Sequence, residues 1–142
     1  MKPVSELLRS RTGTLWHVRP DDSVFSALQL LAQHEVGALV VMDGGRLVGI
    51  VSERDYTRKI ALQSRSSRDT RVSEIMTSQV LTVGPGTGTR ACMALMSEKK
   101  IRHLPVVEDG TVLGMISIRD IMDDIIADHE QTIAQLEGYI ST

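Results

Sequence analysis

The chain is short of aromatic residues, cysteine and long apolar runs, and each shortage restricts what the protein can be. Aromatic residues make up 3% of the 142 residues, so aliphatic side chains and methionine must fill the core. The single cysteine, Cys92, excludes an internal disulfide and fits a reducing compartment. No apolar run approaches the ~20 residues of a membrane-spanning helix, and no signal-peptide core opens the sequence. We therefore expect a soluble, cytoplasmic protein with no membrane partner.

The charge balance gives no reason to expect a nucleic acid as the main partner. Lys and Arg total 16 against 18 Asp and Glu, which gives a formal net charge of −2. Basic residues are concentrated between Arg54 and Arg71, whereas the stretch after Arg119 is acidic. A basic middle segment beside polar turns suits a small phosphate-bearing ligand better than a polymer. Nucleic-acid binding through the 54–71 strip stays open as an alternative.

The chain is a tandem repeat. Segment 47–55, LVGIVSERD, recurs as segment 112–120, VLGMISIRD, and the match extends backwards without a gap as far as Pro20 and Pro85. Each half alone, at about 60 residues, would bury only roughly 60% of its unfolded surface and be marginally stable. A duplication with this period therefore predicts two similar units that pack against each other and share a core.

Each repeat predicts the order helix, short strand, helix, strand, strand, helix. Apolar residues at helical spacing begin at Val24 and again at Thr89. The runs 38–42 and 47–51, joined by Asp-Gly-Gly-Arg, predict a β-hairpin, and the second repeat contains its counterpart. The predicted divisions are a first repeat at 4–62, a linker at 63–71, a second repeat at 72–127 and a helical tail at 128–142.

Beyond its first turns, the last helix has no counterpart in the first repeat. Its apolar residues continue at helical spacing to the end of the chain: Ile121, Ile125, Ile126, Ile133, Leu136 and Ile140. A helix that extends past a duplicated core with an apolar stripe is typical of a packing or dimerisation element. We therefore expect a homodimer.

A Ser-x-x-Asp turn closes the second hairpin strand of each repeat, at Ser52 to Asp55 and at Ser117 to Asp120. One interpretation is a capping box, in which the serine caps the helix and the acid binds back to the amide of the serine. The other is a ribose site, in which the carboxylate accepts two hydrogen bonds from a sugar diol while helix-start amides face phosphate. The repetition of the turn together with its arginine favours the ribose site.

The repeat, the turns and the preceding segment 102–107, RHLPVV, resemble a pair of cystathionine β-synthase (CBS) domains, a Bateman module. The resemblance covers the chain from about Val4 to Ile126. It implies an α/β fold of two repeats, each a small mixed sheet plus helices, stacked about a pseudo-twofold axis, here with a C-terminal helical extension. It also implies two clefts between the repeats that bind adenosine-containing ligands.

The resemblance implies which residues form each cleft. The cleft of the second repeat would be formed by Ser117, Arg119, Asp120, Arg102, His103, Leu15 and Trp16. The cleft of the first repeat would be formed by Ser52, Arg54, Asp55, Gly37, Thr77 and Val80. Gly37 stands where Arg102 stands, so this cleft takes its phosphate charge from Arg54 and the basic linker, binds a different ligand, or stays empty. For Trp16, a packing role and stacking on adenine are equally open.

Catalytic and metal-binding patterns are absent from the sequence. The four histidines lack metal-ligand spacing, and no Gly-x-Ser-x-Gly elbow is present. The glycine-rich segment 84–89 lacks the lysine of a phosphate loop and aligns with an ordinary helix entry. We therefore expect no enzyme. We expect instead a regulatory, signal-transduction module that binds an adenine nucleotide, AMP first and NAD(H) or ATP next, and acts through an unidentified effector protein. A scaffold with vestigial clefts stays open.

Overall fold

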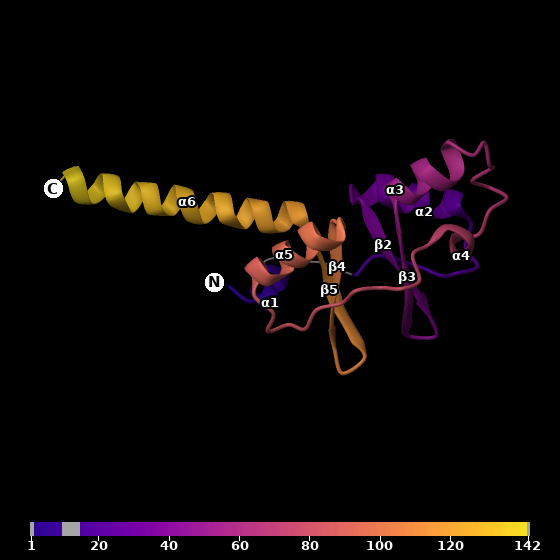
Figure 1. Cartoon of the computed structure of the whole chain (residues 1–142), viewed down its shortest axis with the longest axis horizontal. Helices are drawn as coiled ribbons and strands as arrows, with labels where there is room; N and C mark the ends of the chain where they lie inside the picture. Colours follow the sequence, from indigo (N-terminus) through magenta and orange to yellow (C-terminus); the bar gives the residue numbers. More distant parts are fainter. Residues whose placement is uncertain (1, 10–14, 142) are drawn as a thin grey trace.

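The computed structural model describes residues 2–9 and 15–141. Its elements, in chain order, are α1 (Val4–Arg9), β1 (His17–Val18), α2 (Val24–His34), β2 (Ala38–Asp43), β3 (Arg46–Ser52), α3 (Glu53–Tyr56), η1 (Thr57–Ala61), α4 (Val72–Ile75), α5 (Thr89–Lys99), β4 (His103–Glu108), β5 (Thr111–Ser117) and α6 (Ile118–Ser141). They form two small α/β units, and α6 runs outward from one of them (Figure 1). The predicted α/β fold with two repeats is confirmed.

Each repeat is built around an antiparallel hairpin of equivalent register, β2 with β3 and β4 with β5. Both hairpin loops have two central residues with positive φ, Gly44–Gly45 and Asp109–Gly110. This geometry matches the right-handed twist of the strands, and it explains why both loops contain glycine. The sequence signal for the two hairpins was therefore sound.

The short strand that precedes each hairpin differs between the repeats. In the first repeat, β1 pairs in parallel with β2 over two residues. In the second, the predicted strand is reduced to one parallel bridge between Val83 and Val106. Pro105 stands where Val40 continues the β1 pairing, and a proline has no amide hydrogen to extend the ladder. The prediction of a short strand in both repeats was therefore wrong for the second.

The repeats exchange their opening helices. Val4 of α1 belongs to the buried cluster of the second repeat, with Leu104 and Ile116 of its hairpin. Val72 and Ile75 of α4 belong to the buried cluster of the first repeat. The expected single shared core is thus replaced by two cores, each completed by a helix from the other half of the chain. Two marginal units become interdependent in this way, because neither core is complete without the other repeat.

Two glycines allow this exchange. A Cβ at Gly49 of β3 would lie 2.6 Å from Met76 Sδ and 3.0 Å from the Thr77 carbonyl oxygen. A Cβ at Gly114 of β5 would lie 2.7 Å from Leu8 Cδ2. Leu8 of α1 and the residues just after α4 therefore pack directly on the backbone of the other repeat's hairpin. The repeat of Gly-x-x-Ser in the sequence marks this close approach.

Helices α2 and α5 pack on the two sheets and end in the same way. Glu35 and Lys100, at equivalent positions, both adopt the left-handed conformation that terminates a helix. After the hairpins the repeats diverge, since α3 passes into the π-helical segment η1 whereas α6 continues as one α-helix of 24 residues. Within residues 2–9 and 15–141, no helix combines the length and apolarity needed to cross a bilayer.

Candidate functional site

Two clefts open where the repeats meet. The second-repeat cleft, beside β5 and the start of α6, has a volume of about 590 Å³. The first-repeat cleft, beside β3 and α3, has a volume of about 470 Å³. Both volumes fall within the ~300–1,000 Å³ that small-molecule sites typically occupy. Each cleft is lined by residues of both repeats, so a ligand in either would contact both.

The residues predicted for each cleft lie together in the structure. The second-repeat cleft is lined by Ser117, Arg119, Asp120, Arg102, His103, Leu15 and Trp16, among others. The first-repeat cleft is lined by Ser52, Arg54, Asp55, Gly37, Thr77 and Val80, among others. The structure therefore brings together, in one cleft each, the two sets of residues that the resemblance implied.

Both Ser-x-x-Asp turns form the capping box. In the second repeat, Asp120 Oδ2 accepts hydrogen bonds from the Ser117 amide at 2.7 Å and from its hydroxyl at 2.9 Å. The Asp120 amide donates to Ser117 Oγ at 3.1 Å. The corresponding distances in the first repeat are 2.9, 3.1 and 3.2 Å. The capping interpretation thus describes the geometry of both turns, and these hydrogen bonds fix each carboxylate in the lining of its cleft.

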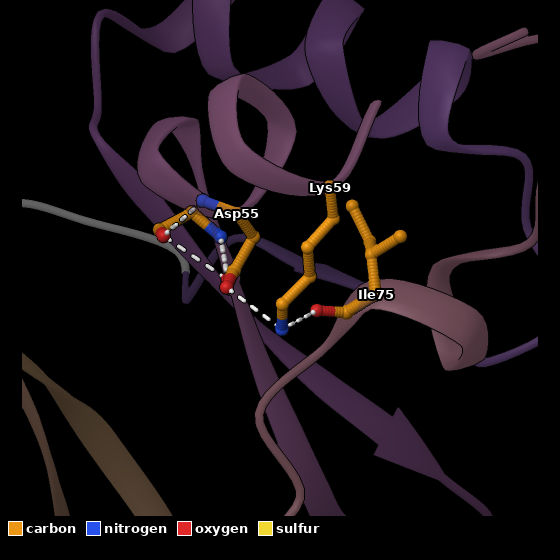
Figure 2. A network of polar contacts seen from close by, with 4 residues as sticks. Asp55, Lys59 and Ile75 are labelled. Carbon is orange, nitrogen blue, oxygen red and sulfur yellow. Dashed lines mark hydrogen bonds and ion pairs between the residues drawn. The ribbon is translucent and has the colours of Figure 1, made fainter. Parts of the chain in front are cut away.

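Asp55 has a second, cationic partner. Lys59 Nζ lies 3.3 Å from Asp55 Oδ1 and donates a hydrogen bond of 2.7 Å to the Ile75 carbonyl oxygen at the end of α4 (Figure 2). The lysine thereby ties the first-repeat turn to the exchanged helix. At the position of Lys59 the second repeat has Asp124, which accepts from Lys2 Nζ at 2.8 Å. In each repeat a lysine therefore links the helix after the turn to the other repeat's opening segment, but the lysine lies on the helix in the first repeat and on the opening segment in the second.

Backbone hydrogen bonds hold each turn against the start of its hairpin. The Glu53 amide donates to the Gly37 carbonyl at 3.0 Å, and the Ile118 amide donates to the Arg102 carbonyl at 2.8 Å. Gly37, Glu53, Arg102 and His103 line both clefts. A Cβ at Gly37 would be 3.4 Å from His103 Cε1, so the imidazole lies directly against this glycine. His103 and Gly37 therefore form part of the wall between the two clefts.

The two clefts differ in charge. The first-repeat cleft is lined by the basic side chains of Arg54, Arg58, Lys100 and Arg102 against the acidic Glu53 and Asp55. The second-repeat cleft is lined by Arg102 and Arg119 against Glu35, Glu53 and Asp120. The first-repeat cleft thus has an excess of basic groups and the second a slight excess of acidic groups. A glycine at position 37 does not leave its cleft without cations, because the second repeat supplies Arg102 and Lys100.

The basic linker does not supply charge to the first-repeat cleft. Arg65 pairs with Glu74 at 2.9 Å, and the Arg68 guanidinium lies 3.9 Å from the ring centroid of Phe25. Neither arginine is among the residues that line the cleft. Of the alternatives left open for this cleft, charge from Arg54 fits the structure, whereas Arg65 and Arg68 of the linker contact Glu74 and Phe25 instead.

Trp16 has a packing partner within the chain. Its ring stacks on His34 with centroids 3.4 Å apart and planes inclined by 8°. It is still 38% exposed and lines the second-repeat cleft. The packing interpretation is therefore correct for one face of the ring, while the exposed part remains at the cleft.

Sequence analysis missed several residues of the clefts. Arg58 and Lys100 in the first-repeat cleft, and Glu35 and Glu53, were not singled out. The repeat alignment contained part of the signal, because Glu35 and Lys100 occupy equivalent helix ends and carry opposite charges. Arg58 has no such signal, since its place depends on the irregular α3 to η1 passage.

The remaining motifs have structural roles in the described residues. Cys92 is buried, and burial raises the pKa of its thiol. The carbonyls of Pro85 and Thr87 in the glycine-rich segment accept from the amides of Ser5 and Val4 at the start of α1, which is a helix entry rather than an anion site. Within residues 2–9 and 15–141, no group of three or more His, Cys, Asp or Glu side chains is arranged to hold a metal ion.

Comparison with known proteins assigns the architecture. The CBS domain family matches residues 4–62 and 72–127. The chain is 39% identical to the CBS domain-containing protein CBSX3, mitochondrial, of Arabidopsis thaliana, over 96% of this chain and 71% of that protein. It is 46% identical to a structurally characterised protein with CBS domains from Burkholderia ambifaria MC40-6, with a TM-score of 0.86 over 89% of this chain and 96% of the other.

A further solved structure similar to this chain contains bound adenosine derivatives. The CBS domain pair of protein MJ0100, in complex with 5′-methylthioadenosine and S-adenosyl-L-methionine, is 25% identical, with a TM-score of 0.79 over 90% of this chain and 98% of the other. The two matched segments contain both hairpins and both Ser-x-x-Asp turns that frame the clefts. The chain therefore belongs to the CBS-domain family and is a regulatory CBS-domain pair.

Proposed function

We propose that the chain is a sensor of adenine nucleotides, with AMP the first candidate and NAD(H) or ATP next. The observation that carries this proposal is the pair of nucleotide-sized clefts, each with a rigid carboxylate at a strand-to-helix turn and arginine beside it. The MJ0100 domain pair, which binds adenosine derivatives, supports the choice of an adenosine ligand.

The capping box is compatible with a ribose site. An ionised carboxylate can accept about four hydrogen bonds, and the cap directs two donors to one oxygen. The two hydroxyls of a ribose would add two more hydrogen-bond donors to the carboxylate. These hydrogen bonds would also offset part of the desolvation free energy of a charged group at a partly buried turn. In the second-repeat cleft, Asp120 would accept from the sugar, and Arg102 or Arg119 would face the phosphate. Trp16 and Leu15 would contact the base from the other side.

The difference in charge predicts a different ligand for each cleft. A single phosphate matches the second-repeat cleft, where two arginines face three acids. A di- or triphosphate matches the first-repeat cleft, where Arg58 and Lys100 add to Arg54 and Arg102. We therefore assign AMP to the second-repeat cleft and place ATP or NAD(H) in the first-repeat cleft.

Regulation would follow from the exchange of helices. A bound nucleotide contacts both repeats, and it stabilises the arrangement of the two repeats that it fits best. A ligand can shift such an equilibrium only by its difference in affinity for the two arrangements. The output would pass to an effector protein or through the geometry of a homodimer.

The test is a thermal-shift panel of adenosine, AMP, ADP, ATP and NAD⁺ on the wild type, Asp55→Asn and Asp120→Asn. A ligand present at a hundredfold its Kd stabilises the native state by about 2.7 kcal/mol. We expect AMP to lose its shift in Asp120→Asn alone, and ATP to lose its shift in Asp55→Asn alone. Asparagine is used because its amide oxygen keeps the cap acceptor while removing the charge.

Two outcomes would contradict the proposal. If no adenine nucleotide shifts the wild type, the clefts do not bind this class of ligand and the scaffold interpretation is favoured. If RNA or DNA binds with strong salt dependence and Asp120→Asn leaves that binding unchanged, the basic 54–71 strip is the functional surface. An Arg58→Gln variant separates the clefts further, because it removes one positive charge from the first-repeat cleft alone.

The cytoplasmic location is part of the same proposal. The one cysteine is buried and forms no disulfide, which fits a reducing compartment. The Arabidopsis relative is named as mitochondrial, so cell fractionation decides between the two compartments.

A further inference from the structure

Helix α6 leaves the body of the protein after its first two turns. Ile121 is fully buried in the second-repeat core, and Ile118 and Ile125 pack against it. Beyond this point the helix continues to Ser141 and projects away from both repeats (Figure 1). A helix segment of about 15 residues whose apolar face is left uncovered is marginal in water, because most helical stability in proteins comes from an apolar face that is covered.

The exposed apolar residues of α6 form one stripe. Met122, Ile126, Ile133 and Leu136 are 52, 52, 54 and 58% exposed. Together with His129 they are spaced alternately by four and three residues, which is the heptad pattern of a coiled coil. Ile140, whose side chain lies outside the described residues, continues the pattern in the sequence. At about 100° per residue, this stripe is roughly a quarter turn from the side that packs on the body.

We propose that this stripe is the seam of a parallel, two-stranded coiled coil between two copies of the chain. Isoleucine falls at heptad position a (Ile126 and Ile133) and leucine at position d (Leu136). β-Branched residues at a with leucine at d favour two strands over three or four. His129 occupies the middle d position, where one polar residue fixes the register at a cost in stability.

The flanking charges select the parallel orientation. The three described e positions are all acidic, Asp123, Glu130 and Glu137, whereas the g positions Ile125 and Thr132 are uncharged. An antiparallel pair places e beside e and would bring these acids together. A parallel pair places e beside g, and no like charges meet there. The single cation of α6, Arg119, also argues against an anionic membrane as the occupant of the stripe.

The first experiment measures the oligomeric state of the full chain by sedimentation. We expect the wild type to be a dimer, and the double variant Ile126→Asp/Ile133→Asp to raise the dimer dissociation constant roughly tenfold or more. The double variant Gln131→Asp/Gln135→Asp is the matched control, because it adds the same two charges on the side of the exposed helix away from the stripe. His129→Leu completes the apolar seam and is expected to lower the dissociation constant.

The second experiment tests orientation by disulfide trapping. Met122→Cys and Leu136→Cys are oxidised separately, with the native cysteine buried. These positions are about 21 Å apart along the helix, so an antiparallel pair can bring at most one of them against its own copy. A parallel pair cross-links both variants.

Three results would overturn the inference. They are a monomeric wild type, a dimer that the double aspartate variant leaves intact, and a cross-link in only one of the two cysteine variants. An intact dimer in the double variant would place the interface on the body instead. Thermal unfolding of each variant checks that the body remains folded, and Met122, the one changed residue that precedes Ile125, is 52% exposed. None of these results depends on nucleotide binding.

Discussion

Replacing Asp55 or Asp120 by alanine is expected to destabilise the protein even without a ligand. Each carboxylate accepts hydrogen bonds from the amide and the hydroxyl of the serine three residues earlier. Alanine removes the acceptor, and the amide at the end of β3 or β5 loses its partner. The same side chains that we propose to bind ribose therefore also hold the turn.

The size of the loss follows from these contacts. Loss of a helix cap costs about 1 kcal/mol in the free energy of unfolding, within a range of roughly 0.5–2 kcal/mol. Asp120→Ala is expected to cost about this much. Asp55→Ala also removes the ion pair to Lys59 at 3.3 Å, an i,i+4 pair worth about 0.3–0.5 kcal/mol. For a chain of this length, 1 kcal/mol lowers the Tm by about 2–4 °C.

The assay is denaturant unfolding of the ligand-free wild type, both alanine variants and both asparagine variants. The order of stability expected is wild type, then asparagine, then alanine at each position, because the amide oxygen still accepts from the serine amide. An alanine variant as stable as the wild type would show that the capping box does not hold the turn in solution. Equal losses for asparagine and alanine would show that charge, not the acceptor, stabilises it.

Three further perturbations test other parts of the structure. Gly49→Ala is expected to destabilise the protein by about 1–3 kcal/mol, because its Cβ would meet a backbone carbonyl oxygen at 3.0 Å. Gly114→Ala is expected to cost less, because its Cβ would meet only the movable end of a leucine side chain. Equal denaturation midpoints for the two variants would contradict this expectation. The Arg71 amide holds the pKa of Glu74 below its ordinary 4.5, so this carboxylate stabilises the fold above that pH and the contribution is lost as the pH falls below it. Glu74→Gln should therefore lose less stability than the wild type when the pH is lowered, as measured by denaturant unfolding at neutral and acid pH. An equal loss in both proteins would show that the Glu74 carboxylate does not contribute to this pH dependence. Burial raises the pKa of the Cys92 thiol, so a thiol reagent is expected to react slowly with the native protein and fast with the unfolded one; rapid native labelling would show that the core opens.

The position of α6 connects the two proposals physically. Its first residue follows Ser117, and Asp120 lies in its first turn, so the helix begins at the second-repeat cleft. The same helix then carries the proposed seam. If nucleotide binding changes the free energy of dimerisation, dimerisation changes the free energy of nucleotide binding by the same amount. Measurement of AMP binding in the wild type and in the dimer-breaking variant tests this coupling.

The sequence alone determined the repeat, and with it much of the architecture. The Gly-rich loops after Met42 and Val107 predicted both hairpins, since two positive φ angles are needed there. The alignment of Ser52 with Ser117 placed a carboxylate turn at the end of each hairpin. These features are local in the chain, and local geometry can be inferred from residue type and spacing.

Only the tertiary structure decided which repeat each opening helix completes and how charge is distributed between the clefts. Val4 and Val72 are equivalent in sequence, and nothing in their spacing shows that each packs in the core of the other repeat. Likewise, the alignment gave the first-repeat cleft a glycine in place of Arg102, whereas the fold brings Arg102 and Lys100 into it from the second repeat. Such contacts join residues far apart in the chain, and they depend on packing of the two units rather than on any pattern within one of them.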